Sequence, residues 1–268
     1  MSVIELNVEE LITQECKLRG YSSKTIKSYL HHVRKFEESR LTPKAFLLDL
    51  IEKKKSDETI RSAGFAVKFY LQILKRNDAS IEMVLKNLPN LKREKKLPII
   101  LSKNEIEHMI KVTKNINHRL IILIGYSAGL RLSEIINLKW QDIDFEREII
   151  HIKKAKGKKD RIVMLSKRVQ QELNMFEQTT PYIFISNRGK KYTERSVQAI
   201  IKTAANKAKI RKNVTPHTLR HSFATHLLEA GTDLRNIKNL LGHADISTTL
   251  IYTKVSNRDI SKIKSPID

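Results

Sequence analysis

Residues 217–231, HTLRHSFATHLLEAG, combine four ionisable side chains with leucine, phenylalanine and alanine. Thr215 and Pro216, directly before this segment, are typical of the N-cap and the first position of a helix. His217 is then expected in the first helical turn, and Arg220, three residues later, on nearly the same face. A helix N-terminus carries partial positive charge and free amide donors. The pattern therefore predicts that His217 and Arg220 bind an anion, most simply a phosphate.

His221 and His226 belong to the same segment and have a simpler interpretation. Leu219, Phe223 and Leu227 recur at helical spacing and predict a face that packs on a hydrophobic core. A histidine beside such a face is more often packed in the structure than used for binding. We therefore expect structural roles for His221 and His226.

A second arginine, Arg131, lies in the segment SAGLRLSEIINL between Gly129 and Glu134. Taken alone, an arginine three residues before a glutamate is an ordinary helical ion pair. With Arg220 it has a further meaning, because two planar guanidinium groups match the oxygens of one phosphodiester better than lysines do. The two arginines together predict a site that stabilises a pentacoordinate phosphorane.

Other segments supply the remaining groups that such a site would need. The segment KKAKGKKDR gathers lysines around Gly157, and one of them could enter a minor groove and donate a proton. The segment LGHADISTTLIYT contains His243 directly after Gly242, and Tyr252 nine residues later. On spacing alone, a tyrosine in this position is expected to pack, with its hydroxyl at the surface.

These side chains complement one another in a single reaction. Phosphoryl transfer needs charge stabilisation on the equatorial oxygens, a nucleophile in line and an acid for the leaving oxygen. The two arginines meet the first need, Tyr252 the second and a lysine the third. His217 and His243 can hydrogen-bond phosphoryl oxygens or accept the tyrosyl proton. The combination indicates phosphoryl transfer more strongly than any of its members.

The composition of the chain agrees with an anionic partner. Of 268 residues, 51 are Lys or Arg and 29 are Asp or Glu, which gives a formal net charge of +22. This self-repulsion favours a polyanion as partner, and nucleic acid is preferred over an anionic membrane. Cys16 is the only cysteine, which excludes an intrachain disulfide and a thiolate metal cluster. Without a signal peptide or a bilayer-spanning segment, the chain is expected in the cytoplasm.

Changes in pattern along the chain predict two domains. Residues 1–88 have helical periodicity throughout and predict an all-helical domain. Residues 89–101 are basic and contain two prolines, which favours an extended linker. Residues 102–268 form the second domain, whose first helix begins with the capping box of Ser102 and Glu105.

The second domain is expected to contain a small sheet. Residues 148–154 and 161–165 are β-branched runs around a glycine-containing turn, which predicts an antiparallel hairpin. Residues 182–186, YIFIS, could add another strand, and helices resume from Thr193. The predicted fold class is therefore mainly α with a small antiparallel β-sheet, arranged as an all-helical N-terminal domain and an α+β second domain.

In this order, the segments GLRLSE, KAKGKKDRIVML, HTLRHSFATHLLEAG and LGHADISTTLIYT resemble the tyrosine recombinase (lambda-integrase) family, most closely its Xer-type members. An H-x-x-R-H segment followed by L-G-H and a tyrosine is a highly specific combination. Residues 1–88 are similar in size to the core-binding domain of that family, so the resemblance covers nearly the whole chain. It implies a two-domain clamp on DNA, with the catalytic domain in residues 102–268.

The resemblance also implies a role for each residue. Four side chains would surround the scissile phosphate: Arg131, His217, Arg220 and His243. Lys156 would be the general acid toward the 5′ oxygen, and Tyr252 the nucleophile of a 3′-phosphotyrosyl linkage. Because this linkage conserves the energy of the broken phosphodiester, no ATP, metal or other cofactor is expected.

The implied partners are DNA and further recombinase subunits. Relatives exchange strands through a Holliday junction as tetramers on a specific double-stranded site, some with a paralogous recombinase or an activator protein. The protein is then expected on the chromosome, without a membrane partner. The compact layout, without an added arm-binding domain, favours chromosome dimer resolution over the integration or excision of a phage or other mobile element.

Three other classes of protein would explain part of this pattern. A helix-turn-helix regulator would account for residues 223–243 and for the charge, but it leaves Tyr252 without a task. A metal-dependent nuclease could use Asp142 and Asp144, although these acids are more simply placed in the turn before the first strand. A type IB topoisomerase uses the same covalent intermediate and needs no tetramer.

Overall fold

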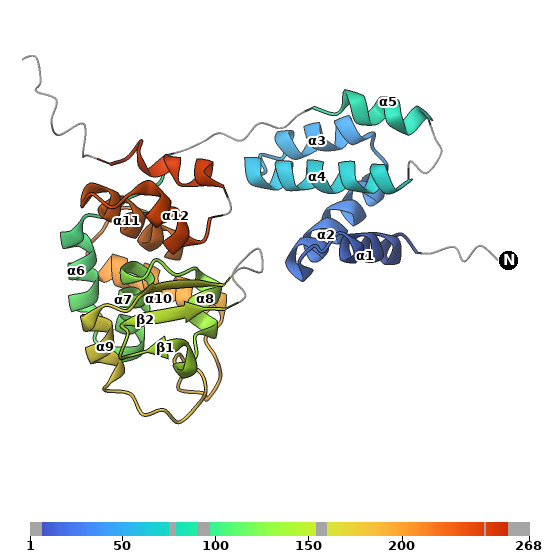
Figure 1. The fold of residues 1–268 in the computed structure, drawn as a ribbon. Helices are drawn as coiled ribbons and strands as arrows, with labels where there is room; N and C mark the ends of the chain where they lie inside the picture. The colour runs from blue at the N-terminus through green and yellow to red at the C-terminus, as the bar shows by residue number, and fades with distance from the viewer. Residues whose placement is uncertain (1–6, 75–78, 90–96, 154–159, 244, 257–268) are drawn as a thin grey trace, which may run out of the picture. The chain divides into compact units, whose positions relative to one another are not determined.

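The computed structural model describes these parts of the chain: residues 7–74, 79–89, 97–153, 160–243 and 245–256. The chain divides into two compact units, Met1–Lys95 and Lys96–Asp268, which are coloured from blue to red in Figure 1. The division falls within the predicted linker, of which residues 90–96 lie outside the described residues. The predicted fold class, mainly helical with a small antiparallel sheet, is confirmed.

In the described part of the N-terminal unit, every regular element is a helix. The helices are α1 Val8–Leu18, α2 Ser23–Ser39, α3 Pro43–Glu52, α4 Asp57–Leu74 and α5 Ala79–Asn87. Local side chains explain two of the helix starts. The hydroxyl of Ser22 accepts a hydrogen bond from the backbone N of Thr25 at 3.1 Å, and Thr42 caps α3 with Pro43 in its first position.

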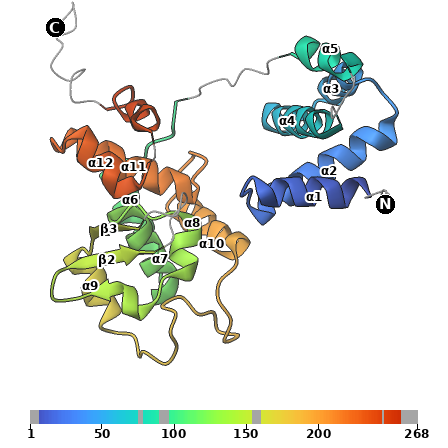
Figure 2. The ribbon, with the colours of Figure 1, turned by 45° about the vertical axis from the view of Figure 1, so that its right-hand side comes forward.

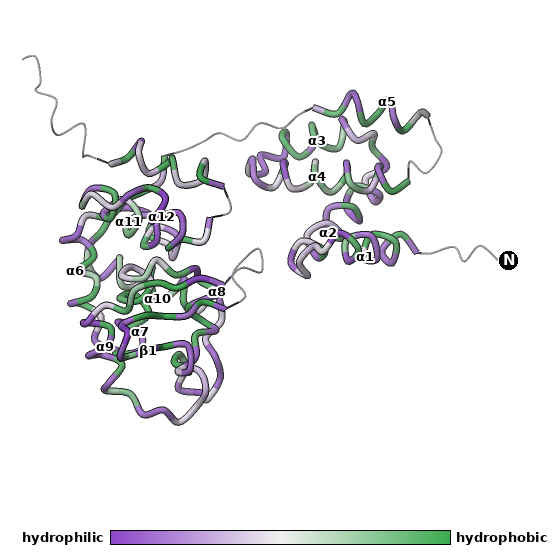
Figure 3. Tube along the Cα trace, in the orientation of Figure 1, coloured by the Kyte–Doolittle hydropathy of each residue, from purple (hydrophilic) through white to green (hydrophobic). Residues whose placement is uncertain are grey.

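Helix α4 forms the centre of the N-terminal unit. Its buried residues recur at intervals of three and four, and Figure 3 colours the hydrophobic positions along the helices of this unit green. One side of α4 packs with α1 and α2 around Cys16 and Val33, and the other packs with α3 and α5 around Phe46. The unit therefore has its own hydrophobic core.

The C-terminal unit contains further helices around one long apolar helix. They are α6 Lys103–Val112, α7 Ile116–Ser127, α8 Leu132–Asn137, α9 Lys167–Leu173, α10 Glu194–Lys207, α11 Pro216–Glu229 and α12 Leu234–Leu241. Residues 120–125 of α7 are buried on every side, as expected for a helix that is apolar all round. Helices α6, α9, α10 and α11 contact α7, and Figure 2 shows this arrangement from a second direction.

Three short strands form an antiparallel sheet in the order β1–β2–β3: β1 Ile143–Asp144, β2 Ile149–Ile152 and β3 Arg161–Met164. Ile150 pairs with Val163, and both are buried in the core, whereas Ile162 on the opposite face is half exposed. This alternation is the one that a half-buried hairpin requires. The predicted hairpin is confirmed.

Two details of the predicted sheet were wrong. Asp144, expected with Asp142 in the turn before the first strand, instead pairs with β2 as part of the edge strand β1, because the side chain of its neighbour Ile143 is buried in the core. Residues 182–186 form no strand and make only isolated bridges, from Tyr182 to Lys139 and from Ile185 to Lys191. In the described part of the chain, no helix is long and apolar enough to span a membrane.

Candidate active site

Helix α11 begins where the sequence predicts. The hydroxyl of Thr215 accepts a hydrogen bond from the backbone N of Thr218 at 3.2 Å, and Pro216 occupies the first position. His217, in the first turn, is exposed, whereas Arg220 is only 3% exposed. The start of α11 therefore places one cationic side chain inside the fold and one imidazole at its surface.

Gly129 lets the chain before α8 pass close to α11. Its φ is +60°, and a Cβ atom there would lie 2.4 Å from a ring carbon of Phe223, so a side chain at this position would clash. The carbonyl of Gly129 accepts a hydrogen bond from Nη1 of Arg220 at 2.6 Å. This approach brings Arg131, two residues after the glycine, next to α11.

Arg131 and Arg220 meet at the C-terminal end of α12. Nη2 of Arg131 donates to the carbonyl of Gly242 at 2.8 Å, and Nη2 of Arg220 donates to the carbonyl of Leu241. The last carbonyls of a helix have no partner within the helix and carry partial negative charge, which favours cations here. The structure thus brings together the two guanidinium groups that the sequence predicts to share a phosphate.

A third guanidinium, not singled out from the sequence, lies at the same place. Nη1 and Nη2 of Arg161 donate to the two carboxylate oxygens of Glu134 at 2.7 and 2.6 Å, and Nε donates to the carbonyl of Leu240 at 2.8 Å. Its position at the start of β3, directly after the lysine-rich turn, is the only sequence signal that could have indicated this. The contacts depend on α8 and α12, which are distant in the sequence.

Glu134 is the carboxylate between these arginines. It also accepts hydrogen bonds from the backbone N of Arg131 at 2.8 Å and from Nη1 of Arg131 at 2.9 Å. Burial alone would raise the pKa of Glu134, but the hydrogen bonds and charges of Arg161 and Arg131 outweigh it and hold the pKa at about 2. Glu134 is therefore a carboxylate at neutral pH, and the three guanidinium groups exceed it by two positive charges.

Tyr252 belongs to the same cluster. It ends a short 3₁₀ helix, Leu250–Tyr252, and is 1% exposed, in contrast to the exposed hydroxyl expected from its spacing alone. Its hydroxyl lies 3.1 Å from Nδ1 of His221, and its ring stacks on His243 with a centroid distance of 6.5 Å. Nδ1 of His243 lies 3.0 Å from the hydroxyl of Thr249. His221, expected to be structural, is thus in contact with the predicted nucleophile.

The electrostatics of the cluster keep its imidazoles neutral. Burial, with the charges of Arg220 and its neighbours, lowers the pKa of His221 and that of His243 to about 4. Partial desolvation of the His217 ring, with the charges of Arg220 and Arg131, also lowers the pKa of His217, although the residue as a whole is exposed. Burial raises the pKa of the Tyr252 phenol, and the charges of Arg220 and Arg131 act against this. Near neutral pH the phenol is protonated and has a neutral imidazole beside it.

His226 lies on the same helix, in a different environment. Its Nδ1 is 2.8 Å from the hydroxyl of Tyr126, and its imidazole forms a hydrogen bond with the backbone of Leu101. Among the described residues, it makes no hydrogen bond or ring contact with the arginines or with Tyr252. Its structural role stays a prediction that fits these contacts.

The remaining predicted residues fall outside this cluster or outside the described residues. Lys156 lies in residues 154–159, which are not described. Asp142 pairs with Lys153 at 3.1 Å, and Oδ1 of Asp144 accepts a hydrogen bond from the backbone N of Arg147 at 2.9 Å. Within the part of the chain that is described, no three His, Cys, Asp or Glu side chains are arranged to hold a metal ion.

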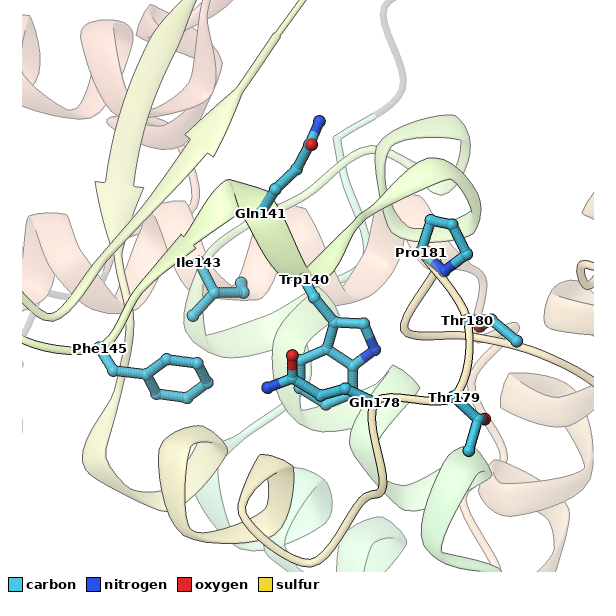
Figure 4. A pocket seen from close by; sticks show the side chains of 8 residues that line it. All are labelled: Trp140, Gln141, Ile143, Phe145, Gln178, Thr179, Thr180 and Pro181. Atoms are coloured by element: carbon cyan, nitrogen blue, oxygen red, sulfur yellow. The ribbon is translucent and has the colours of Figure 1, made fainter.

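A separate hollow of about 670 Å³ lies beside β1. Figure 4 shows the side chains that line it: Trp140, Gln141, Ile143, Phe145, Gln178, Thr179, Thr180 and Pro181. None of them is charged, and none belongs to the arginine and histidine cluster. The hollow therefore offers no group for phosphoryl transfer.

Comparisons with known proteins show the family to which the chain belongs. Residues 100–258 match the phage integrase family. The chain is 36% identical to tyrosine recombinase XerA of Pyrococcus horikoshii, over 96% of this chain and 92% of that protein. The chain belongs to the phage integrase family. The match contains every residue of the predicted site, including Lys156.

Two further comparisons concern a second relative and the fold. A putative integrase/recombinase of Sinorhizobium fredii is 33% identical over 97% of this chain and 88% of that protein. The structure of the XerH recombinase bound to a palindromic difH substrate, in a post-cleavage complex, has a TM-score of 0.73 and 24% identity, and covers 96% of this chain and 83% of that one. As a member of the phage integrase family, the chain is a site-specific DNA recombinase of Xer type.

Proposed function

We propose that the arginine and histidine cluster cleaves and rejoins one DNA strand at a time by transesterification. The assignment gives phosphate binding to Arg131, His217, Arg220 and His243, nucleophilic attack to Tyr252, and protonation of the leaving group to Lys156. In the described part of the chain, Arg131 and Arg220 each donate two hydrogen bonds to protein groups. A guanidinium has about five N–H donors, so both arginines can also donate to phosphate oxygens.

One observation carries this proposal: the phenol of Tyr252 lies in the same cluster as both guanidinium groups. Its hydroxyl is 3.1 Å from His221, the next residue after Arg220, and the charge of Arg220 acts on its pKa. A buried tyrosine that only packed would not need two arginines beside it, because burying their charge is costly. The arrangement supports a nucleophile supplied by the same chain that binds the phosphate.

The reaction balances without a further reactant. The phenolic oxygen of Tyr252 attacks the phosphorus and forms a new phosphorus–oxygen bond. The phosphorus keeps its bond to the 3′ oxygen, and its bond to the 5′ oxygen breaks. The 5′ oxygen takes a proton from Lys156. The phenolic proton passes to a neutral imidazole, and the hydrogen bond to His221 supports this residue as its first acceptor. Reversal by a 5′ hydroxyl of another strand completes strand exchange.

We infer that this chemistry needs neither a metal ion nor ATP. The guanidinium groups supply the positive charge that the pentacoordinate phosphorus requires, and planar forks match its equatorial oxygens. The phosphotyrosyl bond retains the free energy of the phosphodiester that it replaces. Cleavage in the presence of EDTA and without nucleotide tests both statements.

We propose double-stranded DNA as the partner and a tetramer as the active assembly. The net charge of +22 supports binding along phosphates, with an affinity that falls steeply as salt rises. Two duplexes that exchange strands through a Holliday junction need four active sites. Resolution of chromosome dimers is the proposed role in the cell, in the cytoplasm and on the chromosome, with a paralogous recombinase or an activator as further partners.

The first experiment identifies both the DNA and the nucleophile. A pool of randomised duplexes with a single nick is incubated with the chain in EDTA, and DNA that survives SDS on the protein is recovered and sequenced. The recovered sequence, with its nick, is called the selected duplex below. Mass spectrometry of the digested adduct should locate the nucleotide on the peptide that contains Tyr252. Recovery of no covalent DNA, or of DNA on another residue, contradicts the proposal.

Integration or excision of a mobile element is a second candidate with the same chemistry. The similarity to the Sinorhizobium fredii integrase/recombinase over 97% of this chain supports this second candidate. Mapping of the covalent adducts on the chromosome separates the two roles. A single locus supports dimer resolution, whereas adducts at the two ends of a mobile segment support integration and excision.

A further inference from the structure

The end of α12 is held by an unusual set of donors. Three consecutive carbonyls each accept a hydrogen bond from a different guanidinium: Leu240 from Arg161, Leu241 from Arg220 and Gly242 from Arg131. His243 follows directly in the chain. Because the three carbonyls belong to one turn of backbone, a change at one guanidinium affects the position of His243.

Arg161 differs from the other two arginines in how it uses its donors. All three of its nitrogen atoms bind protein groups, namely both oxygens of Glu134 and the carbonyl of Leu240. In the described contacts Arg131, whose side chain is 19% exposed, and Arg220 each use only two nitrogen atoms. Arg161 is therefore engaged by the protein, whereas Arg131 retains donors and access for a ligand.

The carboxylate of Glu134 connects Arg161 to Arg131. Its Oε1 accepts from Nη1 of both arginines, and its Oε2 accepts from Nη2 of Arg161 and from the backbone N of Arg131. A carboxylate has about four lone-pair positions, so these bonds fill it. The orientation of the Glu134 carboxylate, and with it that of the Arg131 guanidinium, depends on Arg161.

Close packing adds to this constraint. Gly242 has a φ of +61°, and a Cβ atom there would lie 2.9 Å from Cδ of Arg161. The side chain of Arg161 thus lies against the backbone that leads into His243. In the described contacts, Arg161 is packed against Glu134, Leu240 and Gly242.

We propose that Arg161 is a positioning residue, which sets the orientation of Arg131 through Glu134 and that of His243 through the end of α12. This inference rests on the proposed function, in which Arg131 and His243 bind the scissile phosphate. Arg161 does not itself touch the DNA. Its effect is therefore on the stabilisation of the transition state, with little effect on DNA affinity.

The first variant is Arg161→Lys, which keeps the charge but loses the planar fork. One ammonium group cannot bind both Glu134 oxygens and the Leu240 carbonyl in the same geometry. Because a misplacement of about 1 Å can cost ~10²-fold in rate, single-turnover cleavage of the selected duplex should fall by about 10- to 100-fold. The Kd for the same duplex should stay within a small factor of that of the unchanged chain.

Arg119→Lys is the matched control. Arg119 also binds a glutamate with two hydrogen bonds, both of 2.8 Å, to Glu172, and it lies in the same unit. It makes no described contact with the arginine and histidine cluster. Both variants lose a bidentate ion pair, so both should lower the unfolding temperature. Only Arg161→Lys should slow cleavage. Equal cleavage rates in the two variants would overturn the proposal.

A charge-neutral phosphate distinguishes positioning from general stability. The selected duplex is made with a methylphosphonate at the scissile position, as two separate diastereomers that lack one or the other charged oxygen. The diastereomer that reduces the defect of Arg131→Ala should also reduce the defect of Arg161→Lys, since both act on the same oxygen. A defect of Arg161→Lys that is equal on both diastereomers and on ordinary phosphate would reject the route through Arg131.

Glu134→Asp provides a second variant if Arg161→Lys unfolds at the assay temperature. The aspartate keeps the charge, but its shorter side chain cannot reach both guanidinium groups, so the same diastereomer should reduce its defect. The proposed function and this inference fail in different ways. If Arg131→Ala cleaves normally, the phosphate site itself is wrong; if Arg131→Ala is defective and neither Arg161→Lys nor Glu134→Asp is, only the role of Arg161 is wrong.

Discussion

Helix α11 contributes the histidines of two histidine–tyrosine pairs. In both pairs, Nδ1 of the histidine contacts the hydroxyl of the tyrosine. Nδ1 of His221 lies 3.1 Å from the hydroxyl of Tyr252, and Nδ1 of His226 lies 2.8 Å from the hydroxyl of Tyr126. The ring centroids are 5.7 Å apart in the first pair and 5.8 Å in the second. By geometry alone, either tyrosine could transfer a proton to its histidine.

The charges around the two pairs differ. Burial raises the pKa of both phenols, but Arg220 and Arg131 act against this at Tyr252, whereas carboxylates on the chain add to it at Tyr126. A phenolate that forms at Tyr252 is therefore stabilised by cations, and one at Tyr126 is not. The surrounding charge, rather than the hydrogen bond, distinguishes Tyr252, the proposed nucleophile, from Tyr126.

Removal of one phenolic oxygen at a time should separate the two pairs most clearly. Tyr252→Phe should abolish the SDS-resistant adduct with the selected duplex, because no other oxygen takes its place, while the Kd for DNA stays nearly unchanged. Tyr126→Phe should leave adduct formation close to that of the unchanged chain. Gel quantification of the adduct measures both variants. An adduct that persists in Tyr252→Phe would reject Tyr252 as the nucleophile.

The next effect comes from removing the cations that distinguish the first pair. Arg220→Ala or Arg131→Ala should each slow cleavage by about 10³-fold or more, as expected for arginines that stabilise a transferring phosphoryl group. Arg119→Ala, which removes a guanidinium from an ion pair elsewhere in the unit, should cleave at nearly the normal rate. Rapid-quench measurement of single-turnover cleavage compares the three. Normal rates in both site variants would show that the phosphate binds elsewhere.

The parts of the fold that depend on local sequence could be predicted. The start of α11 at Thr215 and Pro216 follows from capping chemistry that involves neighbouring residues only, and the β2–β3 hairpin follows from two β-branched runs around a turn. β1 was missed because a strand of two residues has too few side chains to show an alternation. Residues 182–186 have strand-like composition, but pairing partners exist only at single positions.

The site shows the same division between local and distant contacts. Arg131, Arg220 and Tyr252 were singled out by residue type and by resemblance to a family, and their proximity is a result of the fold. The roles of Arg161 and His221 could not be read from the sequence, because each depends on a partner far along the chain. Arg161 meets Leu240 across 79 positions, and His221 meets Tyr252 across 31.

A smaller effect is expected when the imidazoles are replaced. His221→Gln should slow cleavage by about 10²-fold, in the range of a lost proton acceptor, whereas His226→Gln should not. Because the pKa of His221 is about 4, the imidazole accepts a proton at all higher pH values, and cleavage should fall only as the pH drops through about 4. The rate as a function of pH tests this. Faster cleavage by His221→Gln would mean that the hydrogen bond restrains Tyr252 instead of activating it.

The smallest effect concerns stability at the second pair. His226→Gln weakens the contact with the Tyr126 hydroxyl, so the free energy of unfolding should fall by about 1 kcal/mol, the net value of a typical hydrogen bond. Burial lowers the folded-state pKa of His226 below its ordinary value, so the unfolded state binds the proton more readily. The contribution of His226 is therefore complete above that ordinary value and is lost as the pH falls below it. Denaturant unfolding at several pH values should show the difference between His226→Gln and the unchanged chain shrinking toward acid pH; a difference that grows there would mean that the protonated imidazole is the stabilising form.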